Sequence, residues 1–188
     1  MVYSSNNTSL SLTTNSYSSG YLVKIDASGT PLWSTIGYNR DFNNTTVTSL
    51  NGNIYVGSNF RSWNSGTPAT IHANNGTFSI YNPGIGLSCL IKYDTNGNLI
   101  WSRSIGNSGA GVVGSTQIND LISNQGRISV TGIYYAGSCI FYDNTGSIQS
   151  SLNTAEGVDA FYSEYNEDGL LNFAYRISGL DDEIPKRI

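Results

Sequence analysis

A short hairpin sequence that recurs three times constrains this chain more than any other feature. Residues 22–33 read LVKIDASGTPLW, residues 90–101 read LIKYDTNGNLIW and residues 162–173 read YSEYNEDGLLNF. In each copy a strand runs into Asp or Asn, Gly follows three residues later, and a second strand carries an aromatic residue. Asp or Asn at the first turn position accepts backbone N–H groups, and Gly relieves the strain of a left-handed position. The three segments therefore predict three β-hairpins of one design.

The three hairpins share positions that we expect to be structural. These are the turn carboxylate or amide, the turn glycine and the aromatic residue of the second strand: Asp26, Gly29 and Trp33; Asp94, Gly97 and Trp101; and Asn166, Gly169 and Phe173. An aromatic residue that recurs at one position predicts packing between neighbouring copies. The third copy departs from the others, because Glu164 replaces Lys and Phe173 replaces Trp, so we expect it to lie in a different environment.

Two further blocks recur between these hairpins. Residues 47–60 correspond to residues 118–135, and each block reads as two short strands around a tight Asn-Gly or Gln-Gly turn. Residues 70–80 correspond to residues 139–149, and residues 2–12 fit the same pattern. The chain is therefore expected to repeat a unit of several short antiparallel strands.

Four-stranded antiparallel units repeated along a chain are typical of β-propeller blades. We expect a partial blade over residues 1–37, full blades over residues 38–106 and 107–179, and a tail over residues 180–188 that begins another unit or hangs free. No window shows sustained apolar residues at helical spacing. The predicted fold class is all-β, an incomplete, open array of antiparallel four-stranded propeller-like blades.

The repeated register resembles the family of seven-bladed β-propeller repeats. The matching segments are residues 51–57, which read NGNIYVG, and residues 92–101, which read KYDTNGNLIW. The resemblance covers about residues 20–179. It implies the propeller fold and a place in a larger bacterial surface protein or a large virus, and hence an extracellular, cell-surface or virion location.

The number of units poses a problem, because two and a half blades cannot close a ring. An open array leaves an apolar face and strand edges in water, which favours association. Three explanations stay open. The sequence is a segment of a longer propeller, or copies associate to complete a ring or a stack, or the blades fold back into a sandwich or an open stack.

Charge and composition exclude several classes of partner. The formal net charge is −4, whereas nucleic-acid binding requires a basic surface. No stretch approaches the roughly 20 apolar residues that span a bilayer. Cys89 and Cys139 each lie in an apolar run and are expected to be small buried hydrophobic residues, and His72 is the only histidine. We therefore expect no nucleic acid, membrane, metal or cofactor as a partner.

The remaining candidates point to binding and not to catalysis. Trp63 lies in a Gly-, Ser- and Pro-containing loop beside Arg61, and Tyr134 and Tyr135 follow the corresponding strand of the next unit. Together they predict a binding patch, because aromatic residues and Arg often anchor partners. The leading expectation is a non-enzymatic structural or interaction module that binds a protein partner or further blades of the same or another chain. The alternative is a carbohydrate-binding module that takes a glycan, and a hydrolase fragment is the third reading.

Overall fold

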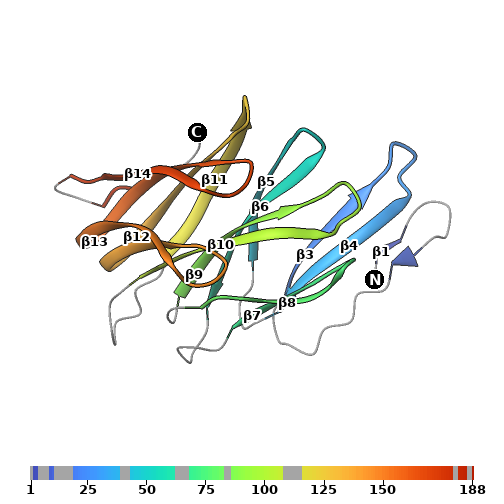
Figure 1. Ribbon diagram of the computed structural model, residues 1–188, viewed down its shortest axis with the longest axis horizontal. Coiled ribbons are helices and arrows are strands. Elements are labelled where there is room, and N and C mark those ends of the chain that lie inside the picture. Colours follow the sequence, from blue (N-terminus) through green and yellow to red (C-terminus); the bar gives the residue numbers. More distant parts are fainter. Residues whose placement is uncertain are drawn as a thin grey trace.

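The computed structural model (Figure 1) is an all-β protein, as the sequence predicts. It describes residues 2–3, 9–10, 19–38, 43–61, 68–82, 86–107, 116–179, 182–185 and 188, and these residues contain no helix. The strands are β1 (Val2–Tyr3), β2 (Ser9–Leu10), β3 (Ser19–Ile25), β4 (Pro31–Tyr38), β5 (Asn43–Leu50), β6 (Asn53–Arg61), β7 (Ala69–Ala73), β8 (Gly76–Ile80), β9 (Gly86–Tyr93), β10 (Leu99–Asn107), β11 (Thr116–Asn124), β12 (Arg127–Tyr142), β13 (Ile148–Asn166) and β14 (Leu171–Ile177).

The strands form three antiparallel sheets. One sheet has the order β3-β4-β7-β8, one has the order β14-β13-β12-β10-β9-β6-β5 with β11 paired to β12, and β1 pairs with β2. We name β3 and β4 the N-terminal group, β5, β6, β9 and β10 the central group, and β11 to β14 the C-terminal group. Figure 1 shows the three groups side by side along the long axis. The propeller arrangement of these groups stays a prediction.

The three predicted hairpins have the same register in the structure. Lys24 lies opposite Trp33, Lys92 opposite Trp101, and Glu164 opposite Phe173. Each hairpin also has a register shift between this pair and the turn, where the second strand carries one extra residue. Such a bulge re-aims the side chains beside it. The hairpins therefore agree in their irregularity as well as in their turns.

Two hairpins inserted between the main strands, β7–β8 and the one formed by the end of β12 and the start of β13, extend the sheet of the preceding group. In the first case β7 pairs with β4, where His72 lies opposite Ile36. In the second case the end of β12 pairs with β10, where Tyr142 lies opposite Ser104. These pairings join residues far apart in the sequence, so each group is tied to its neighbour by backbone hydrogen bonds as well as by side chains.

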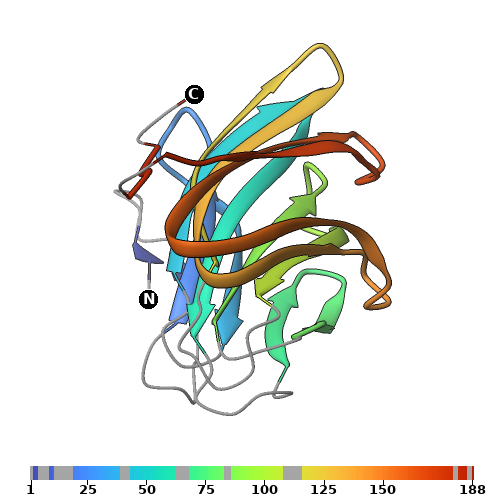
Figure 2. The ribbon, with the colours of Figure 1, turned by 90° about the vertical axis from the view of Figure 1, so that its left-hand side faces the viewer.

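β12 and β13 differ from the two short strands expected at each place. They are 16 and 19 residues long and run without interruption through both the group and the inserted hairpin. Their ladder has register shifts around Gly137, whose φ is 125°, and the strands curve strongly in Figure 2. The bend at Gly137 thus lets one strand run through positions that belong to two separate strands, β6 and β7, earlier in the chain.

Two apolar clusters lie between the groups. The cluster between the N-terminal and central groups contains Ile71 and Ile91, and the cluster between the central and C-terminal groups contains Trp101 and Phe161. Cys89 and Cys139 are free and fully buried, which confirms their expected role, and burial raises the pKa of both thiols. Within the described residues no helix is long and apolar enough to cross a membrane.

Candidate functional site: the outer face of the C-terminal group

The repeated turn residues serve the turns themselves. Asp26, Asp94 and Asn166 each accept backbone N–H groups two and four residues further on, at 2.8 to 3.0 Å. Asp143 builds the same turn in the inserted hairpin of the C-terminal group. The Ser28 hydroxyl, which donates to Asp26, lowers the pKa of that carboxyl. These groups are therefore occupied in local structure, as expected from the sequence.

The lysine and tryptophan that lie opposite each other on a hairpin have a second role. They hold the next group. Lys24 Nζ and Trp33 Nε1 both donate to the backbone oxygen of Thr95, each at 2.9 Å. Thr95 lies in the β9–β10 turn of the central group. A carbonyl oxygen has two lone pairs, so it accepts both donors. We call this Lys-and-Trp pair of donors on one turn carbonyl the clasp.

The clasp recurs between the central and C-terminal groups. Lys92 Nζ and Trp101 Nε1 donate to the backbone oxygen of Glu167, at 2.8 and 3.0 Å. Arg103 adds donors to two further carbonyls of the same turn and lies 4.9 Å from the Trp101 ring centroid. Trp33 and Trp101 are 5% and 8% exposed. Both tryptophans therefore lie between neighbouring groups, with their indole nitrogens bonded to the next group's turn.

The corresponding face of the C-terminal group points away from the central group. Phe161 and Tyr165 of β13 are fully buried in the cluster shared with the central group. Tyr162 and Glu164 alternate with them and therefore lie on the opposite side of the sheet. Phe173 lies directly opposite Glu164, so it shares this outer face. Neither Glu164 as a carboxylate nor Phe173 has a donor that could form a clasp.

A row of aromatic rings lies on this outer face. Tyr162 and Phe173 are stacked with centroids 5.9 Å apart, and Phe173 and Tyr175 have centroids 5.1 Å apart. Tyr175 is 60% exposed. Its counterpart in the central group is Arg103, which is covered by the next turn. This row distinguishes the outer face from the two joined faces.

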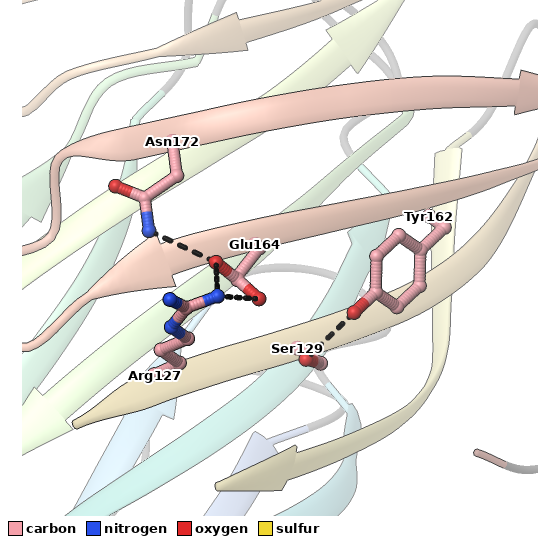
Figure 3. Close-up of polar contacts among 5 residues, drawn as sticks. All are labelled: Arg127, Ser129, Tyr162, Glu164 and Asn172. Atoms are coloured by element: carbon pink, nitrogen blue, oxygen red, sulfur yellow. Dashed lines mark hydrogen bonds and ion pairs between the residues drawn. The ribbon is translucent and has the colours of Figure 1, made fainter. Parts of the chain in front are cut away.

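Four polar side chains lie near Tyr162, the first ring of this row, and Figure 3 draws them together with it. Glu164 is nearly buried and receives hydrogen bonds from Arg127 Nη1 at 3.2 Å and from Asn172 Nδ2 at 3.1 Å. The Tyr162 hydroxyl and the Ser129 hydroxyl lie 2.9 Å apart. The Arg127 side chain is 63% exposed, so only one edge of its guanidinium is engaged. We call these five residues together with Phe173 and Tyr175 the outer-face site.

The structure describes only part of the binding patch predicted from the sequence. Trp63 and the side chain of Arg61 fall outside the described residues. Tyr134 is fully buried in the apolar cluster, and its hydroxyl donates to the backbone oxygen of Asn153. Tyr135 is half-buried. Tyr134 cannot contribute to an exposed patch, because alternation along β12 turns it toward the core.

One feature of the sequence indicated the outer-face site. The departures of Glu164 and Phe173 from the repeated Lys and Trp mark the hairpin that carries it. The pairing of Glu164 with Arg127 and Asn172 was missed, because the register between β12 and β13 is not encoded locally.

No cation site is apparent in the described part of the chain, where no three His, Cys, Asp or Glu side chains gather. His72 hydrogen-bonds through Nδ1 to Thr77 on the neighbouring strand.

A scan against models of known protein families finds no match, and a search of the curated proteins finds no similar sequence.

Proposed function

We propose that this chain is a non-enzymatic interaction module, built from repeated propeller-type units, that binds a protein partner through the outer-face site. One observation carries the proposal. Hairpins of the same register hold the next group at two junctions, whereas the third presents an aromatic row and charged groups to solvent. The face that holds the next group in the first two hairpins is thus exposed in the third, where it can bind another molecule.

The repeat is supported by geometry as well as by sequence. The three hairpins share turn hydrogen bonds, bulge position and register. Two inserted hairpins add to the preceding sheet in matching positions. These features favour blades of the type found in the seven-bladed β-propeller repeat family, and with it the extracellular, cell-surface or virion setting of that family. They also favour further blades or associated copies, since the groups join in a row.

The chemistry of the face suits a protein partner. Tyr and Arg are enriched among residues that dominate protein interfaces, where they pair large apolar contact with a polar end. Tyr175 supplies exposed ring surface, and Arg127 supplies a charge at the border that is only partly neutralised by Glu164. An exposed charge beside an apolar centre is the usual layout of a protein interface.

A glycan is the second candidate, because Tyr175 is an exposed ring next to hydrogen-bonding groups. The rings of the row cover one another, with interplanar angles of 29° and 34° between neighbours. They therefore offer a smaller flat surface to a sugar than their number suggests, which favours the protein partner.

The test compares the wild type with a Phe173→Ala/Tyr175→Ala variant on a displayed peptide library and on a glycan array. Ile148→Ala is the matched control, since Ile148 is also exposed but lies at the start of β13, in the inserted hairpin. We expect selected peptides to bind the wild type and the control and to lose binding to the double variant. Binding that survives the double substitution would contradict the proposal, and selection by glycans alone would replace the protein partner with a sugar.

A further inference from the structure

The strand that carries most of the aromatic row is also the last strand of its sheet. In the part of the chain that the structure describes, β14 has a strand partner only in β13. Arg176 and Ile177 near its end are exposed, Ile177 to 49%. The tail is bonded elsewhere, since the Glu183 N–H donates to the backbone oxygen of Val158 on β13 at 3.1 Å. The outer edge of β14 therefore presents backbone groups that can pair with another strand.

The strands that correspond to β14 each have a second partner. Three residues after the tryptophan of its hairpin, Ile36 of β4 lies opposite His72 of β7. At the same place in the next hairpin, Ser104 of β10 lies opposite Tyr142 of β12. Arg176 has this position on β14. Two of the three corresponding positions are thus paired with an inserted antiparallel hairpin, and among the described residues the third is not.

The next position along shows which side chain such a strand brings. There Ile71 of β7 and Phe141 of β12 lie opposite Gly37 and Ile105. Both added side chains are fully buried, each in one of the two apolar clusters. Ile177 has the corresponding place on β14, two residues after the last ring of the aromatic row, so it shares the outer face with that row. A strand paired with β14 would therefore set a large apolar side chain beside Ile177.

We propose that the protein partner binds the outer-face site as an extended strand, which pairs antiparallel with β14 at Arg176 and Ile177 and places an apolar side chain opposite Ile177. This inference rests on the proposed function and adds how the partner is held. Main-chain hydrogen bonds supply affinity in strand addition, and alternate side chains supply specificity. Every second side chain of the added strand would lie on the outer face, next to the rings of Phe173 and Tyr175.

The pairing inside the chain favours a segment of a different protein as the occupant. A second folded copy has its β7 and the end of its β12 already paired with its own β4 and β10. These strands also indicate the chemistry of the segment, since both carry a large apolar residue at the position that would face Ile177.

The probe is a synthetic peptide with the sequence of residues 69–80, which form the β7–β8 hairpin, titrated against the full chain. We expect saturable binding, because this hairpin already pairs with the corresponding strand β4. Replacing the peptide's Ile71 by Ser should weaken binding about tenfold through the lost apolar contact. Ile177→Asp in the chain should abolish binding, whereas Ile148→Asp, at another exposed isoleucine of the same group, should leave it unchanged.

Amide hydrogen exchange resolved by residue distinguishes strand pairing from docking of side chains alone. The peptide should slow exchange of the alternate β14 amides that point away from β13, because an added strand accepts hydrogen bonds from them. Absence of saturable binding, or binding that Ile177→Asp leaves intact, would overturn the inference. Self-association of the wild type in light scattering that Ile177→Asp abolishes would also overturn it, since a second copy would then be the occupant.

The same exchange measurement separates this inference from the proposed function. It is repeated with peptides that the displayed library selects on the wild type. Selected peptides that lose binding to the Phe173→Ala/Tyr175→Ala variant but leave the β14 amides unprotected would overturn strand pairing and leave the outer-face site as the binding surface. Selected peptides that protect these amides and lose binding to the double variant would support both.

Discussion

The two joined faces and the outer face differ at a few side chains on one common hairpin. Trp33 and Trp101 are buried, and each shares a carbonyl acceptor with a lysine. Phe173 occupies the same place and stacks instead with Tyr162 and Tyr175 at the surface. Backbone and turn stay the same, so the side chains determine whether this face joins another group or meets solvent. Hairpins of one register thus serve contacts within the fold at two places and form a solvent-exposed face at the third.

The largest expected effect comes from removing the clasp indole. Trp101→Ala deletes a buried ring and the hydrogen bond to Glu167, and we expect a loss of about 3–5 kcal/mol in unfolding free energy. Phe173→Ala at the same position of the third hairpin should cost about 1 kcal/mol, because that ring is only partly buried. Urea unfolding measures both. Equal losses would show that the outer face is a packing surface like the other two.

Turn glycines give the next effect. Gly97 and Gly29 have φ values of 79° and 84°, so Ala is strained at both positions. A Cβ on Gly97 would lie 2.7 Å from the Trp33 ring, whereas a Cβ on Gly29 meets nothing within 4 Å. We expect Gly29→Ala to cost about 1–2 kcal/mol and Gly97→Ala to cost about 1–3 kcal/mol more. Thermal unfolding of the two variants measures this difference, and a larger loss of stability in Gly29→Ala than in Gly97→Ala would contradict it.

Charge removal should have a smaller effect that again distinguishes the faces. Lys92→Met removes the clasp donor and leaves only Trp101 on the Glu167 carbonyl, for an expected loss of about 1 kcal/mol. Glu164→Gln keeps acceptor capacity toward Arg127 and Asn172 and should change stability by only a few tenths of a kcal/mol. Chemical denaturation measures the loss in both variants. A larger loss in Glu164→Gln than in Lys92→Met would contradict the prediction.

The smallest expected effect is that of acid on stability, and it should come only from the turns that contain an Asp. The pKa of Asp26 is lowered by the Ser28 hydroxyl, and that of Asp143 by the Thr145 hydroxyl. A lowered folded-state pKa contributes stability above the unfolded pKa of about 3.9 and loses it as pH falls through the folded value. Stability should therefore decline below about pH 4. Asp26→Asn should reduce this slope slightly in acid titrations, and a steeper slope in the variant would contradict the assignment.

Local chemistry explains which parts were predictable from the sequence. The hairpins at residues 22–33, 90–101 and 162–173 were predicted because Asp or Asn and Gly determine their turns within a few residues. The pairing of β7 with β4 and of β12 with β10 was not, because it depends on contacts between distant segments. The departures at Glu164 and Phe173 indicated a different environment, but the alternation that buries Tyr134 became clear only with the strand register.

Hydroxyl-radical footprinting read residue by residue tests the central claim most directly, since it reports the solvent exposure of each aromatic side chain in the unmodified protein. The account predicts strong modification of Tyr175 and protection of Trp33 and Trp101, although tryptophan is the more reactive side chain. Modification of either clasp tryptophan to the level of Tyr175, or protection of Tyr175 in the isolated chain, would contradict it.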